Sequence, residues 1–161
     1  LEPEMWEEGF FDVITAIEVV EHLSEPSRDI EILSKFLRKG GVFYITTPNF
    51  NSLSRKKQGV SWRNIAYPEQ LTYFTKGSLD YLLKSKGFTK ELLQTTGLSL
   101  SDWQKSKTKV EEIRISAESK DEKLRQEFER NILKKAIKRI LNWVLNISST
   151  GDSLKAMYLK L

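Results

Sequence analysis

The stretch from Phe11 to His22 constrains the fold more than any other part of this 161-residue chain. Its first half, Phe11 to Ile17, is apolar and rich in β-branched residues, which is typical of a strand covered on both faces. Its second half is acidic and ends in His22, the sole histidine of the sequence. Ligands of open α/β sheets bind just beyond the carboxyl ends of parallel strands, so we expect the chemistry of this chain directly after Ile17.

Three ionisable side chains follow this strand at positions i, i+3 and i+4: Glu18, Glu21 and His22. If the chain makes a helical turn there, the three side chains project from one face. His22 is the best candidate for a general base, because the ordinary pKa of a histidine lies near neutrality. The plainer alternative is that the carboxylates are solvated charges in a first helical turn and that His22 is structural.

The residues after His22 predict a βαβ unit. Ser24 is placed to cap a helix and Pro26 to occupy its first turn, and an apolar stripe follows at helical spacing. Gly40-Gly41 is expected to end that helix, and Val42 to Thr46 to form a second buried strand.

A polar, basic loop is expected over residues 50–74. Thr75 is placed to cap the next helix and Gly87 to end it. Phe88 to Thr96 reads as a further strand.

Residues 99–150 depart from this alternation. They are rich in Lys, Glu and Ser up to about residue 120, and from Asp121 the apolar residues recur at helical spacing. We expect a lid helix that packs on the domain. The alternatives are a helix that lies on an anionic membrane surface and a helix that forms a dimer. After Gly151-Asp152, residues 153–161 read as a last strand. The stripe and its basic flank comprise Leu124, Phe128, Ile132, Leu133, Ile137, Ile140, Leu141 and Val144, with Lys134, Lys135, Lys138 and Arg139.

Three segments together resemble the class I S-adenosylmethionine-dependent methyltransferases. They read FDVITAIEVVEHL, LRKGGVFYITTPN and YPEQLTYFTKGSLDYLLKSKGF. The E-x-x-E-H motif is similar to that of the branch containing ubiquinone-pathway O-methyltransferases and saccharide methyltransferases. The resemblance covers residues 9–98 and resumes at the C-terminus.

The resemblance implies an α/β fold: the C-terminal part of a Rossmann-like methyltransferase sheet, mostly parallel, with helices on both faces and an antiparallel last strand. It divides the chain into part of the core in residues 1–98, a helical insertion in 99–150 and the last strand in 151–161. The Gly-rich cofactor loop and the acidic residue of the second strand would lie upstream of Leu1. We therefore expect residues 1–161 alone to bind the cofactor weakly and to be inactive.

The resemblance also implies the site. S-adenosylmethionine is expected beside Ala16, Ile17, Glu18 and Val19. The catalytic residues are expected to be His22, Glu18 and Glu21. Asn49, Trp62 and Tyr67 are the candidate contacts to the substrate, although the two aromatic residues can equally serve to pin the loop to the core.

A metal ion is not expected at this cluster, although carboxylate oxygens and one imidazole could still hold a hard divalent ion weakly. Family members that use Mg²⁺ or Mn²⁺ have a second histidine near the positions of Gln70 and Thr72, and neither of these is histidine.

The composition sets outer limits on function. A net charge of +4 permits an anionic ligand or membrane surface but does not predict nucleic-acid binding. The absence of cysteine excludes disulfides and thiolate metal sites and fits a reducing compartment, so we expect a cytoplasmic protein. The function that the resemblance implies for the parent protein is methyl transfer from S-adenosylmethionine to oxygen on a small molecule or saccharide. The alternative is a non-catalytic, truncated or degenerate interaction module whose basic helix binds a partner or a membrane surface.

A homodimer is the expected assembly. In the complete family fold, the strand at Phe11 to Ile17 has a neighbour that this sequence does not contain. Its open edge would carry unpaired backbone groups, and pairing with a second copy would satisfy them.

Overall fold

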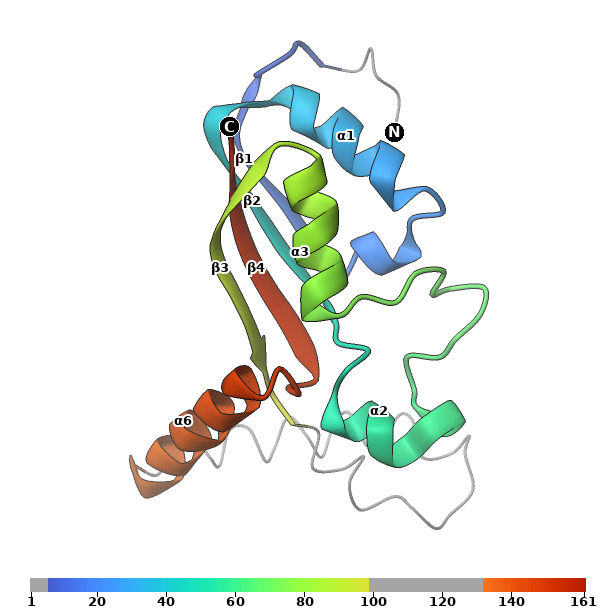
Figure 1. The fold of residues 1–161 in the computed structure, drawn as a ribbon, viewed down its shortest axis with the longest axis vertical. Coiled ribbons are helices and arrows are strands. Elements are labelled where there is room, and N and C mark those ends of the chain that lie inside the picture. Colours follow the sequence, from blue (N-terminus) through green and yellow to red (C-terminus); the bar gives the residue numbers. More distant parts are fainter. Residues whose placement is uncertain (1–5, 99–131) are drawn as a thin grey trace.

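The computed structural model describes residues 6–98 and 132–161 (Figure 1). Four strands form a mixed sheet in the order β1-β2-β4-β3. β1 and β2 are parallel, and β4 runs antiparallel to both β2 and β3. The α/β class and the antiparallel last strand are therefore confirmed. The strands are β1 (Phe11–Ile17), β2 (Leu37–Pro48), β3 (Phe88–Thr96) and β4 (Ser153–Lys160).

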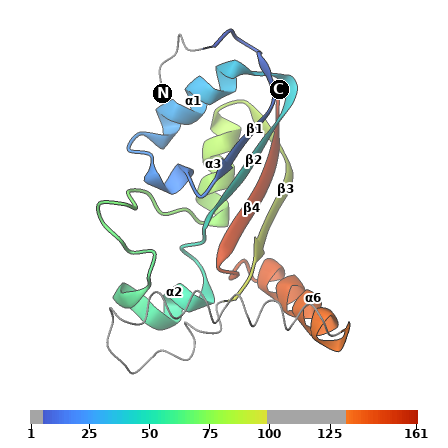
Figure 2. The ribbon, with the colours of Figure 1, turned by 180° about the vertical axis from the view of Figure 1, so that it is seen from behind.

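Helices cover one face of this sheet. Figures 1 and 2 show α1 and α3 packed side by side on the same face, while α2 and α6 lie at the end of the molecule where β3 ends. The helices and 3₁₀ turns are η1 (Val20–His22), α1 (Pro26–Phe36), α2 (Leu53–Gln58), η2 (Gly59–Ser61), α3 (Lys76–Ser85) and α6 (Ile132–Ile147). No helix in the described part of the chain is long and apolar enough to cross a membrane.

The core lies between the sheet and these two helices. Alternate residues of β2 and β4, such as Phe43 and Ala156, point towards the helices and are buried. They meet Ile30 of α1 and Leu79 of α3, which are fully buried. Tyr158 also lies in this core, and its hydroxyl donates a hydrogen bond to Asp80 of α3 at 2.7 Å. Burial, together with the charge of the Asp80 carboxylate, raises the pKa of Tyr158.

The opposite face of the sheet carries exposed apolar residues. Val13 and Ile17 of β1 are 53% and 60% exposed, and Leu92 of β3 is 38% exposed. The prediction that helices cover both faces is not met within residues 6–98 and 132–161. α1 and α3, which follow β1 and β2 in the chain, both pack on the same face.

Both ends of α1 differ from the prediction. Glu25 occupies the N-cap without a side-chain hydrogen bond, so Ser24 is not the cap. The helix ends at Phe36, and Gly40-Gly41 lies inside β2. Leu37 is fully buried in extended conformation, and a Cβ on Gly41 would come within 2.8 Å of its side chain. Burial of Leu37 therefore ends the helix early, and the glycine permits the close approach.

The elements from residue 50 to residue 98 follow the sequence more closely. Thr75 caps α3 in a capping box with Ser78, and β3 has the predicted bounds. The loop over residues 50–74 is broken by α2, which begins at a Ser52 cap whose hydroxyl accepts a hydrogen bond from the N–H of Arg55. The sequence did not predict α2, because its 6 residues make fewer than two turns and carry no apolar stripe.

Of the predicted helical insertion, α6 lies within the described residues, and residues 99–131 lie outside them. α6 leads through Gly151 into β4, as the sequence predicts.

Gly151 is held against the backbone of β3. A Cβ built at this position would lie 2.6 Å from the nitrogen of Thr96 and 2.8 Å from the carbonyl carbon of Thr95. Gly151→Ala should therefore lower the free energy of unfolding by about 2 kcal/mol or more, because the β3 backbone has to move. Gly77→Ala is the matched control, since its Cβ would meet nothing nearer than 4.0 Å and it lies in α3. That variant should gain about 0.5–1 kcal/mol. Equal effects of the two substitutions in denaturant melts would contradict this packing.

Candidate active site

The chain turns sharply where β1 ends. The N–H of Glu18 donates to the carbonyl of Thr46 at 2.9 Å, which continues the pairing of β1 with β2. Glu18 itself has a positive φ of 53°, in the left-handed region. The single 3₁₀ turn Val20–His22 follows immediately. The carboxyl ends of the two parallel strands thus lie together at the end of the sheet nearest α2 (Figure 1).

Glu21 joins three separate segments at this end of the sheet. Its side chain is 2% exposed, and its carboxylate accepts a hydrogen bond from the hydroxyl of Thr47 at 2.9 Å. Its backbone carbonyl accepts from the N–H groups of Leu71 and Thr72, at 2.9 and 3.0 Å. Glu21 therefore holds the turn after β1 to the end of β2 and to the loop before α3.

Burial raises the pKa of the Glu21 carboxyl above its ordinary value. The nearby charge of Glu18 acts in the same direction. Hydrogen bonds from its own backbone and from the Thr47 hydroxyl, and the neighbouring His22, act in the opposite direction but do not cancel the effect of burial.

His22 lies beside Glu21 but is exposed. Its Nδ1 forms a hydrogen bond with the backbone carbonyl of Glu69. A carbonyl only accepts, so Nδ1 carries the proton, and in the neutral ring Nε2 is the nitrogen that accepts one. The loop before α3 thereby fixes both the tautomer and the orientation of the imidazole.

The prediction that Glu18, Glu21 and His22 project from one face is wrong for Glu21. Glu21 points into the protein, whereas Glu18 and His22 are exposed. The left-handed residue at Glu18 precedes the turn, so no continuous helical turn carries all three residues. Within residues 6–98 and 132–161, no three His, Cys, Asp or Glu side chains form a group that could hold a metal ion.

The four residues predicted to lie beside the cofactor form the end of β1 and the turn after it. Ala16 is buried under the helices, while Ile17 and Val19 are 60% and 45% exposed. Glu18 is exposed between them. The exposed surface at the carboxyl end of β1 is thus apolar on both sides of one carboxylate.

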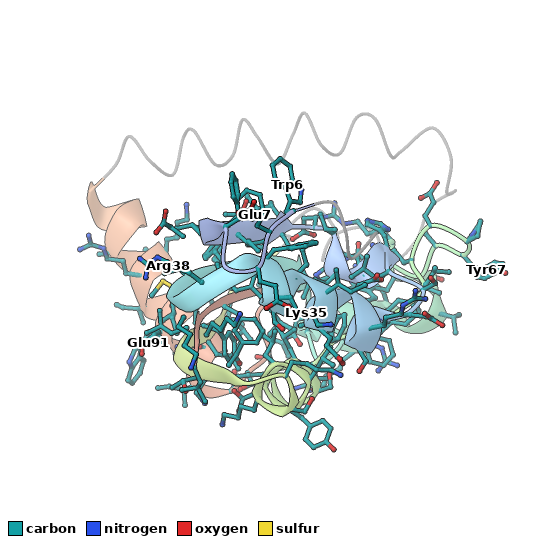
Figure 3. The ribbon with its side chains drawn as sticks, turned by 90° about the horizontal axis from the view of Figure 1, so that it is seen from above. Trp6, Glu7, Lys35, Arg38, Tyr67 and Glu91 are labelled. Carbon is teal, nitrogen blue, oxygen red and sulfur yellow. The ribbon has the colours of Figure 1, made fainter. Side chains whose placement is uncertain are left out.

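The three predicted substrate contacts have different positions. Asn49 is fully buried, and its amide nitrogen donates to the carbonyls of Ser149 and Gly151 at 3.1 and 2.7 Å, which fits a structural role. Trp62 is 3% exposed and packs edge-on against Phe50, as expected of an aromatic residue that pins the loop. Tyr67 is 86% exposed and projects from the surface (Figure 3).

The sequence reasoning missed Thr47, Glu69 and Thr72. Thr47 donates to the Glu21 carboxylate, Glu69 orients His22, and Thr72 donates its backbone N–H to Glu21. Thr47 could have been found from its place at the end of the strand that neighbours β1. The other two contacts are made through the backbone, so their residue types carry no signal.

A family model described as a methyltransferase domain matches residues 3–93, more than half of the chain. The chain belongs to the methyltransferase domain family. The resemblance read from the sequence motifs is therefore confirmed, over part of the domain.

This methyltransferase domain is 29% identical, over 83 residues, to a ubiquinone biosynthesis O-methyltransferase of Caulobacter vibrioides. The match covers 43% of this chain and 33% of the relative, so the chain spans about a third of that protein.

Two solved S-adenosylmethionine-dependent methyltransferases share the fold. One is from Thermotoga maritima and the other from Archaeoglobus fulgidus, each with a TM-score of 0.58 and 13% identity. Each comparison covers 98% of this chain, but only 59% and 63% of the solved chains. The sheet described above therefore corresponds to part of the methyltransferase fold.

The buried Glu21 should make the stability of the methyltransferase domain depend on pH. Its folded-state pKa is raised, so the folded state holds the proton more tightly than the unfolded state does. The free energy of unfolding therefore falls as the pH rises from the unfolded-state pKa, about 4.3, through the raised folded-state pKa. Glu21→Gln removes this titration and keeps an oxygen that accepts from Thr47. We expect the variant to equal or exceed wild type in unfolding free energy at pH 7, with an advantage that shrinks as the pH is lowered.

Thr47→Val provides the comparison. It removes the donor to the ionised carboxylate, so its loss of stability, about 1–2 kcal/mol, should grow as pH rises. Urea melts over a series of pH values measure both variants. A Glu21→Gln variant that loses stability most at pH 7 would show that the charge of Glu21 is stabilising.

Proposed function

We propose that the protein containing this domain transfers a methyl group from S-adenosylmethionine to an oxygen of a small molecule or saccharide. The observation that carries the proposal is the exposed His22 at the carboxyl end of β1, with its Nδ1 donating to the carbonyl of Glu69. This leaves Nε2 to accept the proton of an acceptor hydroxyl. The likeness to an O-methyltransferase over 83 residues supports oxygen as the methylated atom.

The end of β1 fits one side of S-adenosylmethionine. Ile17 and Val19 offer exposed apolar surface, and the carboxylate of Glu18 between them would complement the positive charge of the cofactor. The buried Ala16 keeps the strand end close to the core. When bound, the cofactor supplies an electrophilic methyl group on a sulfonium.

His22, Glu21 and Glu18 have separate roles in this proposal. His22 takes the proton from the acceptor hydroxyl through Nε2. Glu21 is a positioning residue, because it ties the turn that carries His22 to the loop that carries Glu69. Glu18 complements positive charge beside the reacting atoms. Methyl transfer needs the acceptor oxygen aligned with the methyl group, so holding these elements in register accounts for much of the rate.

Tyr67 is the remaining candidate for contact with the acceptor. It stands on the loop that also carries Glu69, and its ring is almost fully exposed. Asn49 and Trp62 support this loop and the end of β2 from inside.

A non-catalytic interaction module is the second candidate function. It is favoured by the basic helix α6, on which apolar residues such as Ile140 and Trp143 are exposed. Activity of the complete protein distinguishes the two functions.

We also propose a homodimer through the outer edge of β1. Within the described residues, β1 pairs with β2 on one side and with no strand on the other. Its exposed Val13 would gain cover from a second copy.

The role of His22 predicts a specific kinetic result. In the complete protein, His22→Ala should lower turnover about 10²–10⁴-fold, because the acceptor loses its base, and leave S-adenosylmethionine affinity nearly unchanged. Glu25→Gln, an exposed carboxylate three residues further along, should change neither quantity. Methyl transfer assays and calorimetry measure both. Unchanged turnover, or an equal loss of cofactor affinity, would contradict the assignment.

The missing loop predicts the behaviour of the isolated segment. Residues 1–161 should bind S-adenosylmethionine weakly or not at all, whereas an upstream-extended protein should bind it, since residues 16–19 line one side of the cofactor. Calorimetry on both proteins makes the comparison. Micromolar binding by residues 1–161 alone would overturn this expectation.

A further inference from the structure

Helix α6 is attached to the domain by its polar side. The side-chain oxygens of Asn142 and Asn146 accept hydrogen bonds from the backbone N–H groups of Gly97 and Thr95, at 3.1 and 3.0 Å. Leu145 between them is 2% exposed, and its carbonyl accepts from the Thr95 hydroxyl at 2.7 Å. These contacts come from the last two turns of α6, so they fix the helix against the end of β3.

The apolar side of α6 is turned away from this attachment. At 100° per residue, the exposed apolar side chains fall on one half of the helix, opposite the two asparagines. Their exposed fractions range from 38% for Leu141 to 66% for Trp143. Figures 1 and 2 show that α6 extends from the end of the sheet, away from α1 and α3. The exposed residues are Ile137, Ile140, Leu141, Trp143, Val144 and Ile147.

Four of these residues form a seam along the middle of the apolar side. Reading along the helix, the seam residues are separated by 3, 4 and 3 positions, the a/d spacing by which helices pair with one another. The spacing is the same when the seam is read backwards. An antiparallel second copy would therefore set Ile140 against Val144 and Ile137 against Ile147, apolar residues of similar size. The seam residues are Ile137, Ile140, Val144 and Ile147.

The seam is made of side chains that lose little freedom on burial. All four are β-branched, and a β-branched side chain in a helix already has one preferred χ1 rotamer. Leu141 and Trp143 flank the seam, one on each side. Lys138 and Arg139 fall on the half of the helix that carries the asparagines, so pairing of two seams does not bring them face to face. The seam therefore offers a continuous apolar surface to a second helix.

The area of this surface is sufficient for a dimer. From their exposed fractions, the six apolar side chains offer about 600 Å² on each copy. Covering both copies removes about 1,200 Å² from water, which lies at the lower end of the range for specific interfaces. An area of this size is typical of a reversible dimer, since permanent dimers bury considerably more.

We propose that two copies of the chain associate through α6, with their seams packed antiparallel about a two-fold axis. Each domain is attached to the asparagine side of its own helix, so the two domains lie on the outer sides of the helix pair. This interface is separate from the outer edge of β1, because α6 is bound to β3, at the opposite edge of the sheet. The inference goes beyond methyl transfer and does not depend on it.

Sedimentation velocity of the complete protein over a range of concentrations tests the proposal. Wild type should associate reversibly through α6. Ile140→Asp should raise the dissociation constant about tenfold or more, because the two-fold axis buries the new carboxylate among apolar side chains twice. Tyr81→Asp is the matched control, since Tyr81 is 78% exposed on α3, and it should associate as wild type does.

A mixture of two variants tests the antiparallel register. Val144→Lys should weaken the dimer as Ile140→Asp does. In a mixed dimer the new carboxylate faces the new ammonium, so the mixture should associate about fivefold more tightly, or better, than either variant alone. Neither a membrane surface, another protein nor another segment of this chain predicts such a restoration. Weakening by both variants without restoration in the mixture would contradict the antiparallel pairing.

Thermal unfolding separates a fold defect from a lost interface. At a concentration at which wild type is monomeric, Ile140→Asp should melt within a few degrees of wild type, because Ile140 is 63% exposed. A large fall in melting temperature would show that the chain itself covers α6 and would overturn the proposal. So would a wild type that stays monomeric at every concentration, or an Ile140→Asp variant that associates as wild type does.

Discussion

The structure depends on the buried contacts of Glu21. One residue uses its carboxylate to accept from Thr47 at the end of β2 and its carbonyl to accept from the loop before α3. Three segments that are far apart in the sequence are thereby held at the carboxyl ends of the parallel strands. The cost is a desolvated carboxyl with a raised pKa. The gain is a fixed position for the neighbouring His22, whose imidazole the same loop orients through the carbonyl of Glu69.

In the described part of the chain, α1 and α3 pack on one face of the sheet that carries these contacts. α1 and α3 bury alternate residues of β2 and β4, and the buried Tyr158 reaches Asp80 of α3 to satisfy its hydroxyl. Burial raises the pKa of Asp80, but hydrogen bonds from Lys84 and Tyr158 and the charge of Lys90 outweigh it and lower the pKa overall. The other face keeps apolar residues such as Val13 exposed. The comparisons cover only about six-tenths of each of the two solved methyltransferases. A sheet with one packed face and one exposed apolar face is consistent with part of such a domain.

α6 shows that an amphipathic pattern does not by itself say which side of a helix faces the domain. Its apolar stripe predicts a lid that packs inward, yet the side that meets β3 is the one carrying Asn142 and Asn146. The two amide oxygens accept hydrogen bonds from backbone N–H groups at the end of β3. These N–H groups would otherwise have no partner in the sheet. This satisfaction, with burial of Leu145, decides the orientation.

The sequence by itself determined the strand at Phe11–Ile17, the capped helix after Thr75, the antiparallel last strand and the methyltransferase family. Each of these depends on local periodicity, on capping or on a contiguous motif. It could not place Glu21 inside and His22 outside, since that depends on the left-handed backbone at Glu18 and on backbone groups of a loop nearly fifty residues away. The early end of α1 and the outward stripe of α6 were likewise decided by tertiary packing. Burial and hydrogen-bond satisfaction between distant segments outweigh local propensity, and a single sequence does not reveal which distant segments meet.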